Sequence, residues 1–225
     1  MTDFQTEREK IKRLPRNQRA GYIWDYYKLP IIAVIAVVCI AVYMISNFIT
    51  NSRPTQLYVA FVNTTTDLGK GSSFYDGYTD SAGVDTSEEN VIFDTQNYFT
   101  IDGEHASSRH YYDKLVVLID ASTVDAVVMD TDTLKSFGSR GRLMNLSDER
   151  VRQLTEKYSD LVITTSYTDE DGNTQEIPIG FDLSKTRLVS RDSAYRNCAV
   201  GISANAQHIS AIEQFMSYVT EEEKA

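Results

Sequence analysis

One uninterrupted apolar run constrains this chain more than any other feature. Residues 29–49 read LPIIAVIAVVCIAVYMISNFI and contain no acidic or basic side chain. At 1.5 Å of rise per residue, a helix of this length spans about 30 Å, which matches the hydrocarbon core of a bilayer. A buried helix in a soluble protein normally carries a polar stripe, whereas here Ser46 and Asn47 come only at the end. The run therefore predicts a transmembrane helix at residues 29–50, in contact with lipid through residues 29–49.

A cleaved signal sequence is the alternative interpretation of such a run. Secretory signals have a shorter apolar stretch, of about 7–15 residues, followed by small residues at the cleavage site. This run is longer, and residues 45–47 (ISN) lack the small-residue pattern. Two valines precede Cys39, so a lipoprotein-type cleavage before that cysteine does not fit either. We therefore expect the helix to be retained.

The distribution of charge predicts the orientation of the chain. Residues 1–49 carry seven Lys or Arg against four Asp or Glu, a net charge of +3. Residues 50–225 carry fifteen against twenty-eight, a net charge of −13, and only Arg53 follows the apolar run within fifteen residues. Cytoplasmic flanks of membrane helices are enriched in Lys and Arg. We expect a single-pass protein of the cell membrane with its amino terminus in the cytoplasm and its carboxyl-terminal domain outside.

Residues 1–28 form the predicted cytoplasmic, basic juxtamembrane tail. Aromatic rings with polar groups favour the boundary between water and lipid. The expected interface residues are Trp24, Tyr26, Tyr27 and Lys28. Two interpretations of the tail stay open: it lies on anionic lipid as a basic amphipathic helix, or it only sets the topology.

Three further segments follow the helix. We expect a short linker at residues 51–56, an extracellular α/β domain at 57–220 and an acidic tail at 221–225. The chain is 42% hydrophobic and 24% charged, which is typical of a globular protein. The strongly negative domain would be repelled by nucleic acid, so we expect no nucleic-acid partner.

The first half of this domain predicts a strand, a helix and a strand in turn. Residues 57–62 (LYVAFV) are apolar without interruption, as in a strand buried on both faces. Apolar residues spaced three and four apart predict a helix over 106–121, and residues 126–129 (AVVM) predict a second buried strand. A parallel crossover follows from this order, so we expect a mixed, mostly parallel sheet with flanking helices.

The second half predicts a hairpin, a strand and two capped helices. Strands at 161–167 and 174–181 flank a turn with an Asp-Gly pair, which is a strong hairpin signal. Ser147 is the expected cap of the helix before the hairpin. A last strand at 198–202 leads to a terminal helix for which Asn205 is the expected cap.

Some stretches resemble known families. Residues 123–131, 178–184 and 199–205 resemble type II periplasmic-binding-protein-like domains, which occur in extracellular solute-binding proteins. Residues 22–32 (YIWDYYKLPII) resemble a family of single-pass membrane proteins of Gram-positive bacteria. The first resemblance implies a periplasmic-binding-protein-like fold that binds a solute in a cleft.

The same resemblance implies four ligand-binding residues. Asp130 and Thr131 follow the strand at 126–129, where solute-binding relatives face their cleft, and Thr64 and Thr65 follow the first strand. Loops at the carboxyl ends of parallel strands meet helix amino termini, which favour polar or anionic ligands. Asp130 and Thr131 equally suit an ordinary helix cap, and both interpretations stay open.

The sequence shows no residue pattern typical of catalysis or metal binding. His105, His110 and His208 lack partner motifs, and the segment DEDGN at 169–173 lacks the ligand spacing of a calcium loop, so a solvated turn is expected. We therefore expect no catalytic residues, no metal and no cofactor. Two functions remain: non-catalytic binding of a small solute or peptide, or an interaction module for a membrane or cell-envelope protein.

Overall fold

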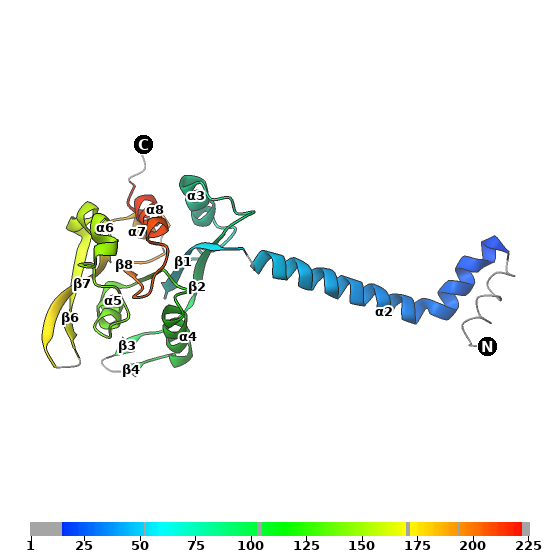
Figure 1. Cartoon of the computed structure of the whole chain (residues 1–225), viewed down its shortest axis with the longest axis horizontal. Coiled ribbons are helices and arrows are strands. Elements are labelled where there is room, and N and C mark those ends of the chain that lie inside the picture. The colour runs from blue at the N-terminus through cyan, green and yellow to red at the C-terminus, as the bar shows by residue number, and fades with distance from the viewer. Residues whose placement is uncertain (1–14, 52, 103–104, 170–171, 193, 222–225) are drawn as a thin grey trace. The chain divides into compact units, whose positions relative to one another are not determined.

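A computed structural model describes residues 15–51, 53–102, 105–169, 172–192 and 194–221 (Figure 1). The chain divides into two compact units, Met1–Arg53 and Pro54–Ala225. Residues 1–14 of the predicted cytoplasmic tail and residues 222–225 of the predicted acidic tail lie outside the described residues.

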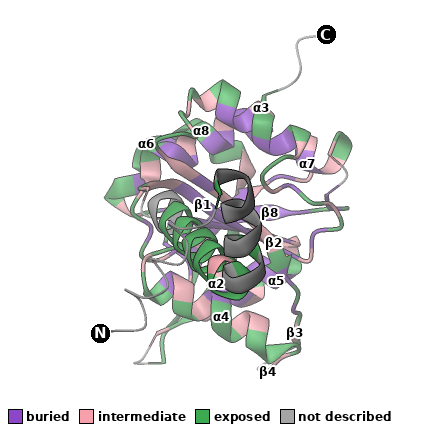
Figure 2. Cartoon of the chain, turned by 90° about the vertical axis from the view of Figure 1, so that its right-hand side faces the viewer, coloured by how far each residue is buried: buried purple, intermediate pink, exposed green. Residues whose placement is uncertain are grey.

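The first unit contains one long helix, α2 (Arg16–Asn51), with Pro30 inside it. Its 20-residue segment Lys28–Asn47 contains an 18-residue window with a mean hydropathy of 2.7, and none of that window is buried. Figure 2 colours most of this segment as exposed. Within the described part of the chain, α2 is the one helix long and apolar enough to cross a membrane, a property that membrane anchors share with signal sequences.

Helix α2 extends beyond the predicted transmembrane segment at its amino-terminal end. The side chain of Trp24 is exposed, as is that of Lys28, whereas the side chains of Tyr26 and Tyr27 lie outside the described set. At the other end α2 reaches Asn51 and the first strand begins at Thr55, inside the predicted linker at 51–56.

The second unit is built on a six-stranded sheet with the order β2-β1-β5-β8-β7-β6. Strand β1 pairs in parallel with β2 and with β5, whereas the β5–β8, β8–β7 and β7–β6 pairs are antiparallel. Four of the six strands therefore point in one direction, which confirms the mixed, mostly parallel sheet. The strands are β1 (Thr55–Val62), β2 (Asn90–Asn97), β5 (Ala126–Met129), β6 (Val162–Thr168), β7 (Thr174–Asp182) and β8 (Ala199–Ile202).

Helices cover both faces of this sheet (Figure 1). Alternate residues of β1 point to opposite faces: Leu57, Val59 and Phe61 join one hydrophobic cluster, and Tyr58, Ala60 and Val62 join the other. This double burial explains the unbroken apolar run that predicts the strand. The helices on the Phe61 face are α3 (Ser73–Ala82), α6 (Arg152–Lys157), α7 (Arg187–Ser190) and α8 (Ile209–Thr220), and those on the Tyr58 face are α4 (Arg109–Asp120) and α5 (Thr131–Gly138).

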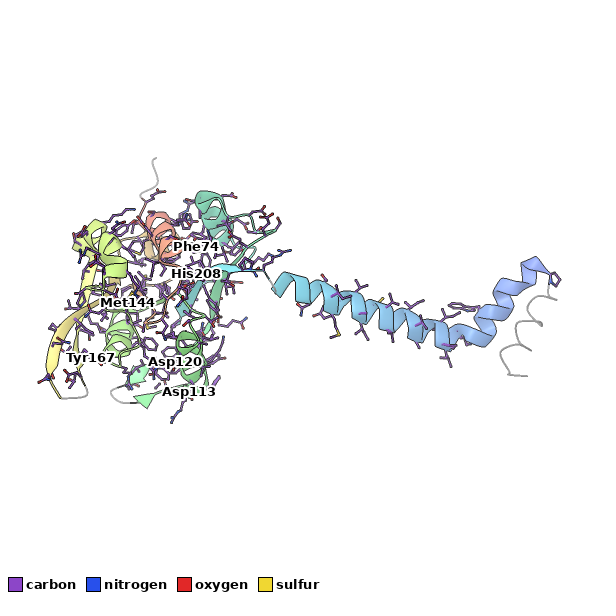
Figure 3. All side chains as sticks on the ribbon, in the orientation of Figure 1. Phe74, Asp113, Asp120, Met144, Tyr167 and His208 are labelled. Atoms are coloured by element: carbon purple, nitrogen blue, oxygen red, sulfur yellow. The ribbon has the colours of Figure 1, made fainter. Side chains whose placement is uncertain are left out.

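Aromatic rings fill the core on the Phe61 face. The ring of Phe61 packs edge-on against Phe93 of β2 at 5.7 Å, Phe74 of α3 at 6.1 Å and Phe215 of α8 at 6.3 Å. Edge-to-face pairs at such centroid distances add about 0.5–1.5 kcal/mol each beyond area burial. These rings fix α3 and α8 on the sheet. Phe74 of α3 is labelled in Figure 3.

Helix α3 is the main element that sequence patterns did not predict. It lies in a stretch rich in Gly, Ser and Asp, and its buried apolar side chains are three aromatic residues, Phe74, Tyr75 and Tyr78. Its ends are nevertheless well defined, because the Ser72 side chain accepts a hydrogen bond from the Tyr75 N–H and Gly83 adopts the left-handed conformation.

Two predicted helix caps are wrong. Asp148, and not Ser147, caps the 3₁₀ turn Glu149–Val151 that leads into α6, because its side chain accepts the Arg150 N–H. Asn205 does not cap α8, which begins at Ile209. The buried carboxylate of Asp125, from elsewhere in the chain, instead accepts the N–H groups of Gln207 and His208, the two residues before the helix.

The structure shortens one predicted helix and confirms the predicted hairpin. The predicted helix at 106–121 begins later, at Arg109, because residues 105–106 belong to a small antiparallel pair. The predicted hairpin is confirmed as β6 and β7, with Gly172 at a φ of +83° in the connecting turn. The short elements are β3 (Ile101–Asp102), β4 (His105–Ala106) and the 3₁₀ turn Ser159–Leu161.

Candidate functional site

The carboxyl ends of β1 and β5 form the switch point of the sheet. In the sheet, β1 lies between β2, which is the next strand in sequence, and β5. Ligands of open α/β sheets bind at such points, outside the carboxyl ends of the strands. Thr64 and Thr65 follow β1, and Asp130 and Thr131 follow β5, so the fold brings the four predicted residues to one edge of the sheet.

Residues of the connection between α7 and β8 occupy this edge. The carbonyl oxygen of Ala194 accepts hydrogen bonds from the Thr65 N–H at 3.1 Å and from the Thr64 hydroxyl at 3.3 Å. The Thr65 hydroxyl lies 3.3 Å from the same oxygen. The loop after β1 is therefore held against this segment.

Tyr195 spans the two strand ends. Its hydroxyl lies 2.9 Å from the carbonyl oxygen of Val62, the last residue of β1, and 3.1 Å from that of Val128 in β5. Burial raises the pKa of Tyr195 well above its usual range, and the nearby acidic groups of Cys198 and Asp130 add to this effect. The hydroxyl therefore stays protonated and acts as a donor that joins β1 to β5.

Asp130 acts as the cap of α5. Its Oδ1 accepts a hydrogen bond from the Thr133 N–H at 3.0 Å, which confirms the helix-cap interpretation. Thr131 is the first residue of the helix. Thr64 is buried, Asp130 and Thr131 are half-buried, and only Thr65 is exposed, so most of the polar groups predicted to meet a ligand already have partners within the chain.

Sequence patterns did not indicate Tyr195. It lies between a short helix and the last strand, in a polar stretch without periodicity. Its role follows from contacts with residues 133 and 67 positions away in the sequence. Local sequence patterns do not indicate contacts between residues that are so far apart in the sequence.

A second polar site lies at the opposite end of β5. The carboxylate of Asp125 is fully buried, and the ring of His208 lies 3.0 Å from its Oδ1. The same carboxylate accepts hydrogen bonds from the backbone N–H groups of Tyr58, Gln207 and His208. This arrangement holds the start of α8 against β1 and β5, which is a structural role.

The remaining chemistry-bearing residues do not converge. Within the described ranges, no group of three or more His, Cys, Asp or Glu is placed to hold a metal ion. Burial raises the pKa of the Cys198 thiol to about 12, with the charge of Asp182 adding to it, which makes this thiol unreactive. His110 stacks on its neighbour Tyr111 on α4, far in sequence from His208.

Comparisons with models of known protein families, with curated proteins and with solved structures gave no match.

Proposed function

We propose that this chain is a single-pass membrane protein whose cytoplasmic amino terminus and helix α2 anchor a non-catalytic recognition domain at the outside of the cell. The exposed, apolar face of Lys28–Asn47 supports the anchor. The excess of Lys and Arg before this segment supports the orientation.

Single cysteines test the orientation in intact cells. Cys39→Ser removes the exposed thiol, and Cys198 is buried. In this background, Thr123→Cys on the domain should react with a membrane-impermeant maleimide, whereas Gln18→Cys should react only after lysis. The reverse pattern, or release of the chain by carbonate at high pH, would refute the anchored arrangement.

The target of the domain is proposed to be a membrane or cell-envelope protein. The observation that carries this proposal is the filling of the switch-point edge by Ala194 and Tyr195, whose polar atoms are bonded to the loop and strand ends there. A domain with this edge filled recognises its target by its surface.

Photo-crosslinking in living cells tests this proposal. Val117 on α4 is the most exposed large hydrophobic side chain of the described part of the domain, at 63%. A photoreactive amino acid in its place should give one discrete adduct with a protein partner. Ser81, on the opposite face of the sheet, is the matched control position, and adducts that are the same at both positions, or that contain only this chain, would refute the proposal.

Solute binding is the second candidate function, with a periplasmic-binding-protein-like fold. The gathering of Thr64, Thr65, Asp130 and Thr131 at one switch point supports it, because ligands of α/β sheets bind there. A small solute or peptide would have to displace Tyr195 from the strand ends. This function predicts that the Tyr195 contacts weaken when ligand binds.

Thermal unfolding with a panel of amino acids, sugars and short peptides separates the two candidates. Under solute binding, one compound should raise the melting temperature of the full chain in detergent. Thr65→Val should remove the shift, and Thr123→Val, also at an exposed threonine, should keep it. No shift with any compound would refute solute binding within that panel.

A further inference from the structure

A groove between α3, α7 and α8 is distinct from the switch-point edge. It has a volume of about 710 Å³, which falls in the usual range of small-molecule sites. Ser81 at the end of α3 and Tyr218 to Glu221 at the end of α8 form two of its walls. The third wall is the turn from Lys185 to Arg191 that contains α7.

The charge of this groove is opposite to that of the domain. Three of its lining side chains are cationic, those of Lys185, Arg187 and Arg191, and one is anionic, that of Glu221. Residues 50–225 carry a net charge of −13, so a groove with more cationic than anionic side chains differs from the rest of the domain. Such a concentration of one sign raises the local concentration of ligands of the opposite sign.

Arg187 is held in a fixed position in the groove. Its guanidinium lies 4.2 Å from the ring centre of Tyr218 and 5.6 Å from that of Phe74. Its Nε donates a hydrogen bond to Asp192 at 3.0 Å. Among the described residues its two Nη groups have no hydrogen-bond partner, so they are available to an acceptor in the groove.

The turn that carries the three cations is internally braced. The Thr186 hydroxyl donates to the Leu183 carbonyl at 2.7 Å, and the Asp192 N–H donates to the Arg187 carbonyl at 2.8 Å. Thr186 and Leu188 are buried beneath the turn. The backbone from which the cationic side chains extend is therefore preorganised, which lowers the entropic cost of binding.

The geometry points to this groove as a binding site for a phosphate group. A phosphate carries up to two negative charges and several acceptor oxygens, which suit a guanidinium fork together with further cations at the rim. The exposed side chains of Lys185 and Arg191 supply those cations, and the Ser81 hydroxyl lies on the facing wall. The phosphate belongs either to a free solute or to a lipid headgroup, since the chain carries a candidate membrane helix. This site is independent of the target proposed above.

Titration calorimetry of the full chain in a maltoside detergent, which contains no phosphate, tests the site. Inorganic phosphate and glycerol phosphate probe a free solute, and short-chain phosphatidylglycerol probes a headgroup. Binding of any of these compounds supports the site. The compound that binds shows whether the phosphate comes from a free solute or from a lipid headgroup. No heat from any of the three, or equal binding of acetate at the same ionic strength, would overturn it.

Variants that remove positive or negative charge from the groove should change phosphate binding in opposite directions. The double change Lys185→Ala and Arg191→Ala should weaken binding about tenfold or more, because charge-assisted contacts are lost. Glu221→Gln should tighten binding, because it removes the groove's anionic side chain. Arg109→Ala, at an exposed position on α4, is the control and should change nothing. Equal weakening by the control, or weaker binding by Glu221→Gln, would overturn the assignment.

Discussion

The imidazole Nδ1 of His208 lies 3.0 Å from Oδ1 and 3.1 Å from Oδ2 of Asp125, and this pair joins the start of α8 to the residue before β5. The carboxylate is fully buried, whereas the imidazole is 42% exposed. The carboxylate also accepts the backbone N–H groups of Tyr58 in β1 and of Gln207 and His208, so it ties the segment before α8 to the sheet.

Asp125→Ala should lower the free energy of unfolding by about 2–4 kcal/mol, because buried N–H groups lose their acceptor. Urea unfolding of the full chain in detergent, followed by far-UV circular dichroism, measures this loss. Asp120→Ala is the matched control, because its 58% exposed side chain pairs with Arg142 at the surface. The control should cost less than about 1 kcal/mol, and equal costs would contradict this structural role of Asp125.

Tyr195→Phe removes only the hydroxyl that bridges Val62 and Val128. We expect a loss of about 1–2 kcal/mol in the free energy of unfolding, because two carbonyl oxygens lose a buried donor. The same urea experiment measures it, with Tyr98→Phe, at a ring that is 48% exposed, as the control. A Tyr195→Phe protein as stable as the control would show that the bridge contributes nothing.

Elements that depend on short-range patterns could be predicted from the sequence. The strand at 57–62 is apolar throughout because β1 is central and buried on both faces. The helix around Leu115 and Ile119 shows its buried stripe because its other face is exposed. Asp130 could be placed at a helix start, because its cap bond to Thr133 spans only three residues.

Elements that depend on long-range contacts could not be predicted. Asp125 holds the residues before α8 across 82 and 83 positions, whereas Asn205 was expected as a cap from the local sequence alone. Tyr195 fills the edge where Thr64 and Asp130 were expected to meet a ligand, and this contact also joins distant segments. Helix α3 was missed because its buried face consists of three aromatic residues and Thr79, in a stretch rich in Gly, Ser and Asp.

Asp94 makes the stability of the domain dependent on pH. Burial alone would raise the pKa of Asp94, but hydrogen bonds from Lys114, the Gln96 N–H and Tyr58 lower it below its usual range. Lys114 Nζ lies 2.9 Å from Oδ2 of this carboxylate. A lowered folded-state pKa stabilises the fold above the unfolded-state pKa of about 3.9, and this contribution disappears as the pH falls through the folded-state value.

Asp94→Asn should therefore be less stable than the unmodified chain near neutral pH, and the difference should shrink below about pH 4. Urea unfolding at about pH 7 and about pH 3.5 measures both differences. Asp113→Asn is the control, because this carboxylate is 57% exposed and lies 3.5 Å from Arg109 at the surface. A constant difference for Asp94→Asn across this pH range would contradict the assignment.

Gly180 in β7 lies against the backbone of β8. A Cβ at this position would overlap the carbonyl oxygen of Val200, so the two strands would have to separate. Gly180→Ala should cost about 3 kcal/mol or more in unfolding free energy. At Gly77 in α3 a Cβ would instead meet the hydroxyl end of Tyr218, which can move more easily. Gly77→Ala should therefore cost clearly less, and a reversed order in urea unfolding would contradict this packing.

Cys198 should react with thiol reagents only when the domain unfolds. Burial raises its pKa from 9.0 to about 12, and the charge of Asp182 adds to this effect. The thiolate fraction at pH 8 is then lower by about a thousandfold, and the thiolate is the reactive form. In a Cys39→Ser variant, maleimide labelling should be negligible in buffer and rapid in urea, with a midpoint that matches unfolding followed by circular dichroism. Labelling in buffer at the rate seen in urea would show that the carboxyl-terminal part of the sheet opens, because Cys198 lies directly before β8 between its neighbours β5 and β7.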